Sequence, residues 1–450
     1  MKKKKIFTLL LIIGWSFFFN FLSITISTNG TTRIKTSNLD IKYINIEWDD
    51  TWDPTPPPIP PMETQRVYPQ SIVLDKNNNV IITGGLYNLS GYREAFLIKY
   101  DNSGEYKWYE SLGDYDETWA NSVDIDSSGN IYITGVVQDY IPNNISLFLS
   151  KYSPSGSHQW DRFWSPNEDS EGSDIYIDSQ DRIYVIGTNN SPISGTDDIC
   201  LLAYNSSGHQ IFVKEWDLSG PDEGLSIDGD DDNSLYLGGF IGFRMMGLIK
   251  TNMMGEIQWN VTTNTLASDY SVNVRYSKIE NRDNIYLIGE ERYYSDSLFK
   301  FDSEGNFEIL YNESASTSLW PPGVTSPIEM ALDSKDNFYL AGGYYNESWN
   351  FYIQKISNSG KSLWGIKWKI SNFSASEEVI TALTLDTNNS IYIAGAMDGI
   401  LYIAKFNEKP ISSDTSIPIN LDFFIIFLLI GTFIGILSVI HNKFKVTCTR

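Results

Sequence analysis

Short runs of alternating apolar and polar residues fill most of this chain, and they recur in the same order about every fifty residues. In one copy, Trp119–Asp126 alternates and is followed by a turn at Ser127–Gly129 and by a second run at Asn130–Gly135. A third run, Leu147–Tyr152, and a fourth around Gln159–Phe163 complete the copy. Such runs, separated by Asp, Asn, Ser and Gly, predict antiparallel strands joined by tight turns.

The most regular part of the repeat is an acidic turn followed by a short β run that ends in glycine. Its seven copies run from Leu74 to Gly84, Asp126 to Gly135, Asp178 to Gly187, Asp228 to Gly238, Glu280 to Gly289, Asp333 to Gly342 and Asp386 to Gly395. Four strands in each copy predict an all-β fold, a seven-bladed β-propeller of four-stranded blades. A β-solenoid is the alternative fold, although its repeats are usually shorter.

The third and fourth strands carry a second repeated phrase, in which Lys99, Gly104 and Trp108 stand at fixed spacing. The counterparts are Lys151, Gly156 and Trp160, then Lys250, Gly255 and Trp259, then Lys355, Gly360 and Trp364. A large aromatic side chain at this position predicts that one blade packs against its neighbour through it.

The seventh repeat is incomplete, because it ends after Leu401–Asn407 without a fourth strand. An unpaired strand edge would leave the ring open. The stretch Ile41–Trp48, which precedes the first repeat, ends in alternating apolar and polar residues. We therefore predict that Ile41–Trp48 supplies the missing strand and closes the ring.

These features resemble the bacterial and archaeal β-propeller repeat family, whose units carry an Asp, a Gly-Asn turn, a Tyr-rich strand and a terminal Gly. The segment Asp126–Gly135 fits that pattern best, and the resemblance covers roughly residues 63 to 407. It implies the propeller fold and a surface or secreted protein. It implies little chemistry, since propellers host many unrelated activities.

The two ends of the chain predict export and membrane attachment. Lys2–Lys5 precede the apolar run Ile6–Leu22, which is typical of a signal peptide, with an uncleaved anchor as the alternative. Phe423–Ile440 is long enough to span a bilayer as a helix, and the basic residues after it predict a cytoplasmic tail. The expected domains are a signal peptide or anchor at 1–28, an N-terminal segment with the closing strand and a Pro-rich spacer at 29–62, the propeller at 63–408, a stalk at 409–421, a transmembrane helix at 422–441 and a tail at 442–450.

Composition agrees with a propeller outside the cell, held at the cell membrane by a single-pass helix. The net charge of −23 argues against nucleic acid and anionic lipid as partners. Cys200 and Cys448 are predicted on opposite sides of the membrane, and Cys200 is expected to be a small core residue. Candidate glycosylation sites are Asn88, Asn144, Asn205, Asn260, Asn312, Asn346 and Asn372.

Catalytic motifs are sparse in this sequence. The three histidines, His158, His209 and His441, have neither zinc-site nor triad spacing, and no Gly-x-Ser-x-Gly elbow occurs. Paired carboxylates for glycoside hydrolysis stay open, because the chain has 56 acidic residues. The spacing within Asp101–Trp108 partly resembles the tryptophan-docking motif of quinoprotein propellers, which implies a quinoprotein-like oxidoreductase as a minor alternative.

One acidic pattern recurs just before the first strand of several repeats. Its members are Asp116, Glu117, Asp169, Glu171, Asp222, Glu223, Asp269, Glu377 and Glu378. In a propeller these loops surround the central channel on one face, so a ring of carboxylates there could bind Ca²⁺ or a basic partner surface. The competing interpretation is that these residues cap turns and face solvent. No other cofactor is expected.

The sequence favours a binding module that uses its channel-face loops to recognise a surface protein, a glycan or an envelope component. The aromatic residues that could stack on sugars or fill partner pockets there are Tyr115, Trp119, Tyr140, Tyr293, Tyr294, Trp320, Tyr344, Tyr345 and Trp349. The alternatives are an extracellular enzyme, carbohydrate-active or quinoprotein-like, and a passive structural protein of the envelope.

Overall fold

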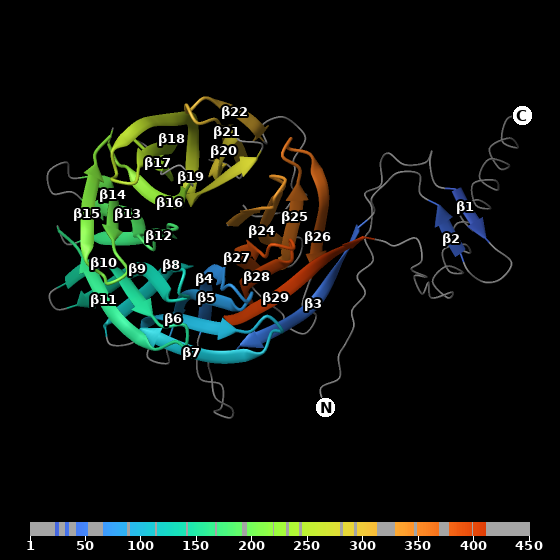
Figure 1. Cartoon of the computed structure of the whole chain (residues 1–450), viewed down its shortest axis with the longest axis horizontal. Coiled ribbons are helices and arrows are strands. Elements are labelled where there is room, and N and C mark those ends of the chain that lie inside the picture. Colours follow the sequence, from blue (N-terminus) through green and yellow to red (C-terminus); the bar gives the residue numbers. More distant parts are fainter. Residues whose placement is uncertain are drawn as a thin grey trace, which may run out of the picture. The chain divides into compact units, whose positions relative to one another are not determined.

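A computed structural model of the chain describes residues 23–26, 32–35, 42–52, 66–87, 91–112, 115–140, 143–166, 169–190, 196–218, 220–230, 234–242, 245–279, 282–291, 295–312, 329–345, 349–368, 378–397 and 399–410. In these residues the regular structure is all β, and residues 45–407 belong to one compact unit. That unit is a seven-bladed β-propeller in which each blade has four antiparallel strands (Figure 1). The predicted fold is confirmed.

The strands follow one another in chain order within blades 1 to 6, whereas in blade 7 the N-terminal strand β3 follows β29. Blades 1 to 3 consist of β4 (Arg66–Leu74), β5 (Val80–Tyr87), β6 (Arg93–Tyr100) and β7 (Tyr106–Leu112), then β8 (Glu117–Ile125), β9 (Ile131–Tyr140), β10 (Asn143–Tyr152) and β11 (His158–Trp164), then β12 (Ser170–Ile177), β13 (Ile183–Asn190), β14 (Asp197–Tyr204) and β15 (Gln210–Trp216). Blade 4 consists of β16 (Glu223–Gly229), β17 (Ser234–Ile241), β18 (Met245–Asn252) and the first part of β19 (Ile257–Ile279), and blade 5 consists of the later part of β19, β20 (Arg282–Glu291), β21 (Ser295–Phe301) and β22 (Phe307–Asn312). Blade 6 consists of β23 (Glu329–Leu332), β24 (Phe338–Tyr345), β25 (Trp349–Ile356) and β26 (Ser362–Trp368). Blade 7 consists of β27 (Glu378–Leu385), β28 (Ile391–Met397), β29 (Ile400–Pro410) and β3 (Lys42–Trp52). The first strand of each blade lies nearest the centre of the ring (Figure 1).

Blades 4 and 5 share one long strand, which the sequence did not predict. The first part of β19 pairs with β18, up to the pair Met245 and Leu266, and its later part pairs with β20 from Ala267 onward. The fourth strand of blade 4 therefore continues into the first strand of blade 5, and the two blades form one seven-stranded sheet. Each blade still contains four strand segments.

The aspartate of the acidic turn holds the first two strands together in blades 1 to 4, 6 and 7. In blade 2, Asp126 accepts hydrogen bonds from the backbone amides of Ser128 at 3.0 Å and Asn130 at 2.8 Å. Its second oxygen accepts from the hydroxyl of Tyr132 at 3.0 Å, and Lys151 lies 5.0 Å from the centre of the Tyr132 ring. One buried carboxylate thus satisfies the turn and joins three strands.

In the fourth repeat, the structure moves the turn aspartate and the closing glycine from the positions that the sequence pattern predicts. Its turn aspartate is Asp230, which accepts from the amide of Ser234 at 2.8 Å and from the hydroxyl of Tyr236 at 2.8 Å. The sequence pattern predicts Asp228 as the turn aspartate, but Asp228 lies in the inner strand β16. The structural counterpart of the closing glycine is likewise Gly239, one residue after Gly238, because it pairs with Gly224 at the bulge.

The closing glycines are explained by a β-bulge in the first strand. In blade 2 the register between β8 and β9 shifts between Ala120 and Ser122. The bulge brings the carbonyl oxygen of Trp119 over Gly135, where a Cβ atom would lie 2.0 Å from it. The same close approach of a first-strand carbonyl occurs at Gly84, Gly187, Gly239 and Gly395. Only glycine fits under the bulged strand.

The prediction that the N-terminal chain closes the ring is confirmed, because β3 is the fourth strand of blade 7 next to β29. Glu47 of β3 forms an ion pair with Lys405 at 3.1 Å and accepts a hydrogen bond from Asn407. On the other side, the indole N–H of Trp48 donates to the carbonyl of Asn102 in blade 1 at 3.1 Å. The strand therefore connects the last blade to the first.

Trp48 packs blade 7 against blade 1 in the same way that Trp108 packs blade 1 against blade 2. Its ring lies against Gly104 of blade 1, as the ring of Trp108 lies against Gly156 of blade 2. Both glycines have positive φ angles, 81° and 89°. The predicted role of this aromatic position in packing neighbouring blades is confirmed for Trp108 and for Trp259, whose ring lies against Gly305, whereas at Gly208 the nearest side chain is Arg162 rather than Trp160. It also accounts for the spacing within Asp101–Trp108 as a blade-packing feature.

In a second unit of the chain, β1 (Ser23–Ile26) pairs with β2 (Thr32–Lys35) in a two-stranded antiparallel sheet. The predicted membrane helix at 422–441 and the basic start of the predicted signal peptide lie outside the described residues, so both stay predictions. Within the ranges that the structure describes, no helix has the length and apolar character to cross a bilayer.

The tryptophan contact predicts different costs for two glycine substitutions. Gly91 and Gly156 both have positive φ, but a Cβ at Gly91 meets nothing within 4 Å, whereas at Gly156 it would lie 2.9 Å from the Trp108 ring. Gly91→Ala should lower the free energy of unfolding by about 1 kcal/mol through backbone strain alone. Gly156→Ala should cost about 2 to 3 kcal/mol, since the indole must also move. Urea unfolding of both variants measures the difference, and equal costs would show that this contact does not hold the blades together.

Candidate binding surfaces

The two ends of the first strands define two faces of the ring. In β8, Glu117 lies at the start of the strand and Ile125 at its end. We call the face where first strands begin the entry face, and the face that carries the turns between first and second strands the turn face. Among the predicted carboxylates, the described side chains lie near the starts of first strands, on the entry face; they are Asp116, Glu117, Asp169, Glu171, Asp222 and Glu223.

The predicted acidic residues have local partners on the entry face. Glu117 forms an ion pair with Arg93 of blade 1 at 3.0 Å, and Glu171 accepts a hydrogen bond from the side chain of Asn121 at 2.9 Å. Asp222 is fully buried and accepts from the backbone amides of Leu218 and Gly242, each at 2.6 Å. Of these three residues only Asp222 accepts backbone amides, and it is buried rather than exposed to solvent, while Glu117 and Glu171 bond to side chains of the preceding blade.

The remaining members of the acidic set are spread around the face. Asp116 and Asp169 are exposed, Glu223 begins β16, and Asp269 lies within the continuous strand β19 where a loop had been expected. Glu377 lies outside the described residues, as do the side chains of Asp269 and Glu378. Among the described side chains, no three His, Cys, Asp or Glu residues are grouped as metal ligands. Calcium binding by this set stays a prediction.

The candidate glycosylation sites are placed in part. Asn144 lies in β10, where its side-chain amide donates to Ser146 at 3.0 Å, and Asn205 caps a turn by accepting from the amides of Ser207 and His209. Asn260 is exposed in β19. Asn88, Asn346, Asn372 and the side chain of Asn312 lie outside the described residues. Cys200 is a buried free cysteine, as expected, and burial raises the pKa of its thiol.

An aromatic ledge lies on the entry face where blade 1 meets blade 2, and it consists of Tyr68, Tyr87 and Trp119. The ring centroids are 5.9 Å apart for Tyr68 and Tyr87, 5.8 Å for Tyr68 and Trp119, and 6.2 Å for Tyr87 and Trp119. The sequence identified Trp119 but missed Tyr68 and Tyr87. A signal was present, because Tyr68 occupies in blade 1 the same bulge position as Trp119 in blade 2.

The other aromatic residues proposed for this face are placed only in part. Tyr115 packs on Phe163 of its own blade, with ring centroids 5.2 Å apart. Tyr293, Tyr294 and Trp320 lie outside the described residues, as do the side chains of Tyr140, Tyr344, Tyr345 and Trp349.

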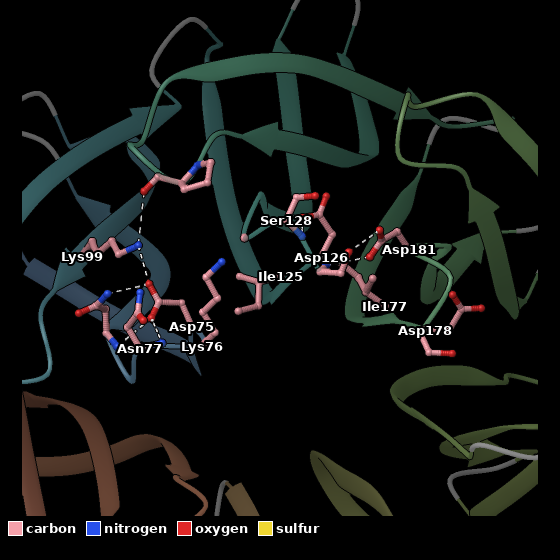
Figure 2. A pocket seen from close by; sticks show the side chains of 15 residues that line it. Asp75, Lys76, Asn77, Lys99, Ile125, Asp126, Ser128, Ile177, Asp178 and Asp181 are labelled. Atoms are coloured by element: carbon pink, nitrogen blue, oxygen red, sulfur yellow. Dashed lines mark hydrogen bonds and ion pairs between the residues drawn. The ribbon is translucent and has the colours of Figure 1, made fainter.

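A pocket of about 640 Å³ opens on the turn face across blades 1 to 3 (Figure 2). Ile125 and Ile177 lie between two acidic turns, with Asp75 and Lys99 at one side and Asp181 at the other (Figure 2). Its lining residues are Asp75, Lys76, Asn77, Asn79, Lys99, Ile125, Asp126, Ser127, Ser128, Gly129, Pro154, Ile177, Asp178, Ser179 and Asp181. None of the predicted acidic ring residues is among them.

The carboxylates of this pocket are engaged in the fold. Asp75 forms an ion pair with Lys99 at 2.9 Å, and although burial opposes it, hydrogen bonds from Asn79 and Lys99 hold the pKa of Asp75 below its usual value. Asp181 reaches from blade 3 to accept from the amide and hydroxyl of Ser127, each at 2.8 Å. The pocket therefore has a rigid, already paired polar rim, which suits binding better than proton transfer.

A third group of carboxylates lies on the inner strands and was missed by the sequence analysis. Asp174 of β12 accepts from the hydroxyl of Ser122 in blade 2 at 2.6 Å and from the amide of Ile227 in blade 4 at 3.0 Å. Asp124 of β8 accepts from the amide of Ile177 in blade 3 at 2.8 Å. These side chains satisfy backbone amides on the inner edge of the neighbouring blade, where no strand pairs with them.

The environment of Asp124 disfavours its charge. Burial is the main cause, and Asp174 and Asp228 add like charge, which together raise the pKa of Asp124 to about 7. In the unfolded chain the same carboxyl ionises near its usual value of 3.8. The folded state therefore holds a proton that the unfolded chain has released, and stability falls as the pH rises between these two values.

Asp124→Asn tests this linkage, because the amide stays neutral and keeps an oxygen that can accept from Ile177. The variant should gain thermal stability relative to the parent chain as the pH is raised from 4.5 to 8, and the gain should level off above about pH 7. Melting temperatures of both proteins across this range measure it. A difference that does not change with pH would contradict the raised pKa.

Two comparisons with known proteins bear on this fold. An uncharacterised WD repeat-containing protein (L264) of Acanthamoeba polyphaga mimivirus is 22% identical over a region that covers 38% of this chain and 17% of that protein. The chain thus matches a small part of that relative's length. Residues 112–136, which include β8, the Asp126 turn and the start of β9, match the family model of the beta-propeller repeat. Together with the seven blades, this match, which spans one of the seven repeats, supports a relation of the chain to the β-propeller repeat family.

Proposed function

We propose that this chain is a binding module of the cell surface, anchored by its C-terminal segment and recognising a protein, a glycan or another envelope component with its entry face. The observation that carries the proposal is the aromatic ledge, which offers Tyr87 at 36% exposure on a scaffold held by the closed ring. Rigid presentation reduces the ordering cost of binding. The paired carboxylates of the turn face favour a binding role over catalysis there.

The relative supports an interaction role at the level of the fold. Its printed name describes WD repeats, and propellers built from such repeats present loops around a central channel. Since function depends on sites rather than folds, the ligand must be sought in residues particular to this chain. The net charge of −23 favours neutral or basic ligands.

Affinity capture tests the binding role directly. The full-length chain is used to capture from native membranes and envelope extract, with calcium or with chelator, beside two variants. Tyr87→Ala alters the entry face, and Lys76→Ala alters the exposed lysine of the turn-face pocket. We expect a discrete partner that Tyr87→Ala loses and Lys76→Ala retains, and calcium dependence would support the carboxylate ring. Recovery of nothing under either condition would favour a passive structural role.

The two cysteines of the chain provide a test of its predicted orientation in the membrane. Cys200 is buried in β14, so a membrane-impermeant maleimide should not label it in the folded protein. Cys448 belongs to the predicted cytoplasmic tail. We expect labelling only after cells are permeabilised, and none in a Cys448→Ser variant. Labelling of Cys448 on intact cells would overturn the orientation.

A further inference from the structure

The aromatic ledge is fixed in place before any ligand arrives. Tyr68 pairs across the sheet with Gly85, and the Trp119 ring covers that glycine so closely that a Cβ there would lie 2.1 Å from it. Beside it, the buried hydroxyl of Thr118 accepts from the amide of Ala95 and donates to the carbonyl of Leu112, each at 2.7 Å. Blade 2 is thereby locked to blade 1 at the ledge.

A charged pair lies next to the ledge on the same side of the sheet. Arg93 pairs across β5 and β6 with Tyr87, and its Nε lies 3.0 Å from the carboxylate of Glu117. The Arg93 side chain is 43% exposed and that of Glu117 is 15% exposed. This pair borders the ledge with hydrogen-bond donors and acceptors of opposite charge, and Arg66 pairs with Tyr87 on the other side.

This combination matches the two surfaces of a sugar ring. The C–H bonds of a pyranose carry partial positive charge and are attracted to the negative face of an aromatic ring, while hydroxyl groups need paired donors and acceptors. Sites for small polar ligands generally combine an apolar wall with a few placed polar groups. The acidic chain repels polyanions, so the matching sugar is a neutral one.

Among the described residues, few large apolar side chains are exposed at the ledge. Around the ledge, the large apolar side chains that are exposed among described residues are Tyr87 and Tyr92, whereas Phe163, Ile211, Ile309 and Leu363 lie on separate outer strands. A stable protein interface buries roughly 800 Å² on each partner. A ledge of three rings is closer in size to one or two sugar units.

The ledge also departs from the repeat. Tyr68 and Trp119 share one position at the first-strand bulge, and the residues at that position in blades 3, 4 and 7 are Glu171, Glu223 and Val379. Because these blades form without an aromatic residue there, the fold does not require one. Among the described blades, aromatic residues at this position are therefore particular to blades 1 and 2.

We propose that the aromatic ledge, with the Arg93–Glu117 pair beside it, is a binding site for a neutral glycan that stacks on Tyr87 and hydrogen-bonds to the charged pair. This inference rests on the proposed binding function and assigns it a site and a ligand class.

Calorimetric titration of the full-length chain tests the proposal, in a detergent whose headgroup is not a sugar. The probes are cellohexaose, maltohexaose, chitohexaose and mannohexaose, with a hyaluronan oligosaccharide as the acidic comparison. At least one neutral hexasaccharide should bind, and the acidic one should not. Tyr87→Ala should weaken that binding at least tenfold, and Arg93→Ala should weaken it several-fold.

Tyr106→Ala is the matched control, because Tyr106 is 46% exposed on the outer strand β7 of the same blade. It should leave binding unchanged, and thermal melts of all three variants establish that they are folded. No binding of any neutral probe, or binding that Tyr87→Ala leaves intact, would overturn the glycan site. If a protein partner is nevertheless captured through Tyr87, the glycan inference fails while the proposed binding function stands.

Discussion

The carboxylate of the acidic turn is the interaction on which blades 1 to 4, 6 and 7 depend. Asp126 accepts hydrogen bonds from two backbone amides and from the hydroxyl of Tyr132. Burial and the charge of Asp126 raise the pKa of Tyr132, so its hydroxyl stays protonated and donates. Lys151, from the third strand, lies over the same ring. Removing the carboxylate would leave buried donors without an acceptor, which costs more than the bonds contribute. The turn, the second strand and the third strand are thus held together by one carboxylate, so losing any one of them weakens the other two.

Neighbouring blades are joined by side-chain contacts, so a single blade is not expected to be stable outside the ring. Trp108 lies on Gly156 at the rim, and Asp124 and Asp174 satisfy amides of the following blade near the centre. A blade at an open end would lack one of these neighbours and expose a sheet edge. This is why the last blade takes its outer strand from β3, whose Trp48 also supplies the tryptophan contact to blade 1.

These dependencies explain how much of the structure the sequence reveals. Asp126, Tyr132 and Gly135 are visible as a repeated pattern in the sequence because each meets a local requirement of its own blade. The segment that ends at Trp48 could be assigned to the closing strand because the seventh repeat lacks a fourth strand. The continuity of β19 could not be foreseen, since it depends on how two blades are spaced. Nor could the role of Asp124, because its partner Ile177 belongs to another blade and the contact follows from strand twist and the bulge.

The same reasoning separates the two faces of the ring. On the turn face, Asp75, Asp126 and Asp181 are occupied by turns and by contacts between blades, so the pocket there is a consequence of how the repeats meet. On the entry face, the bulge position tolerates tyrosine, tryptophan, glutamate and valine without a change of fold. A position that the fold leaves unconstrained is where a ligand can determine the residue. The entry face, rather than the pocket of the turn face, is therefore where binding specificity is expected.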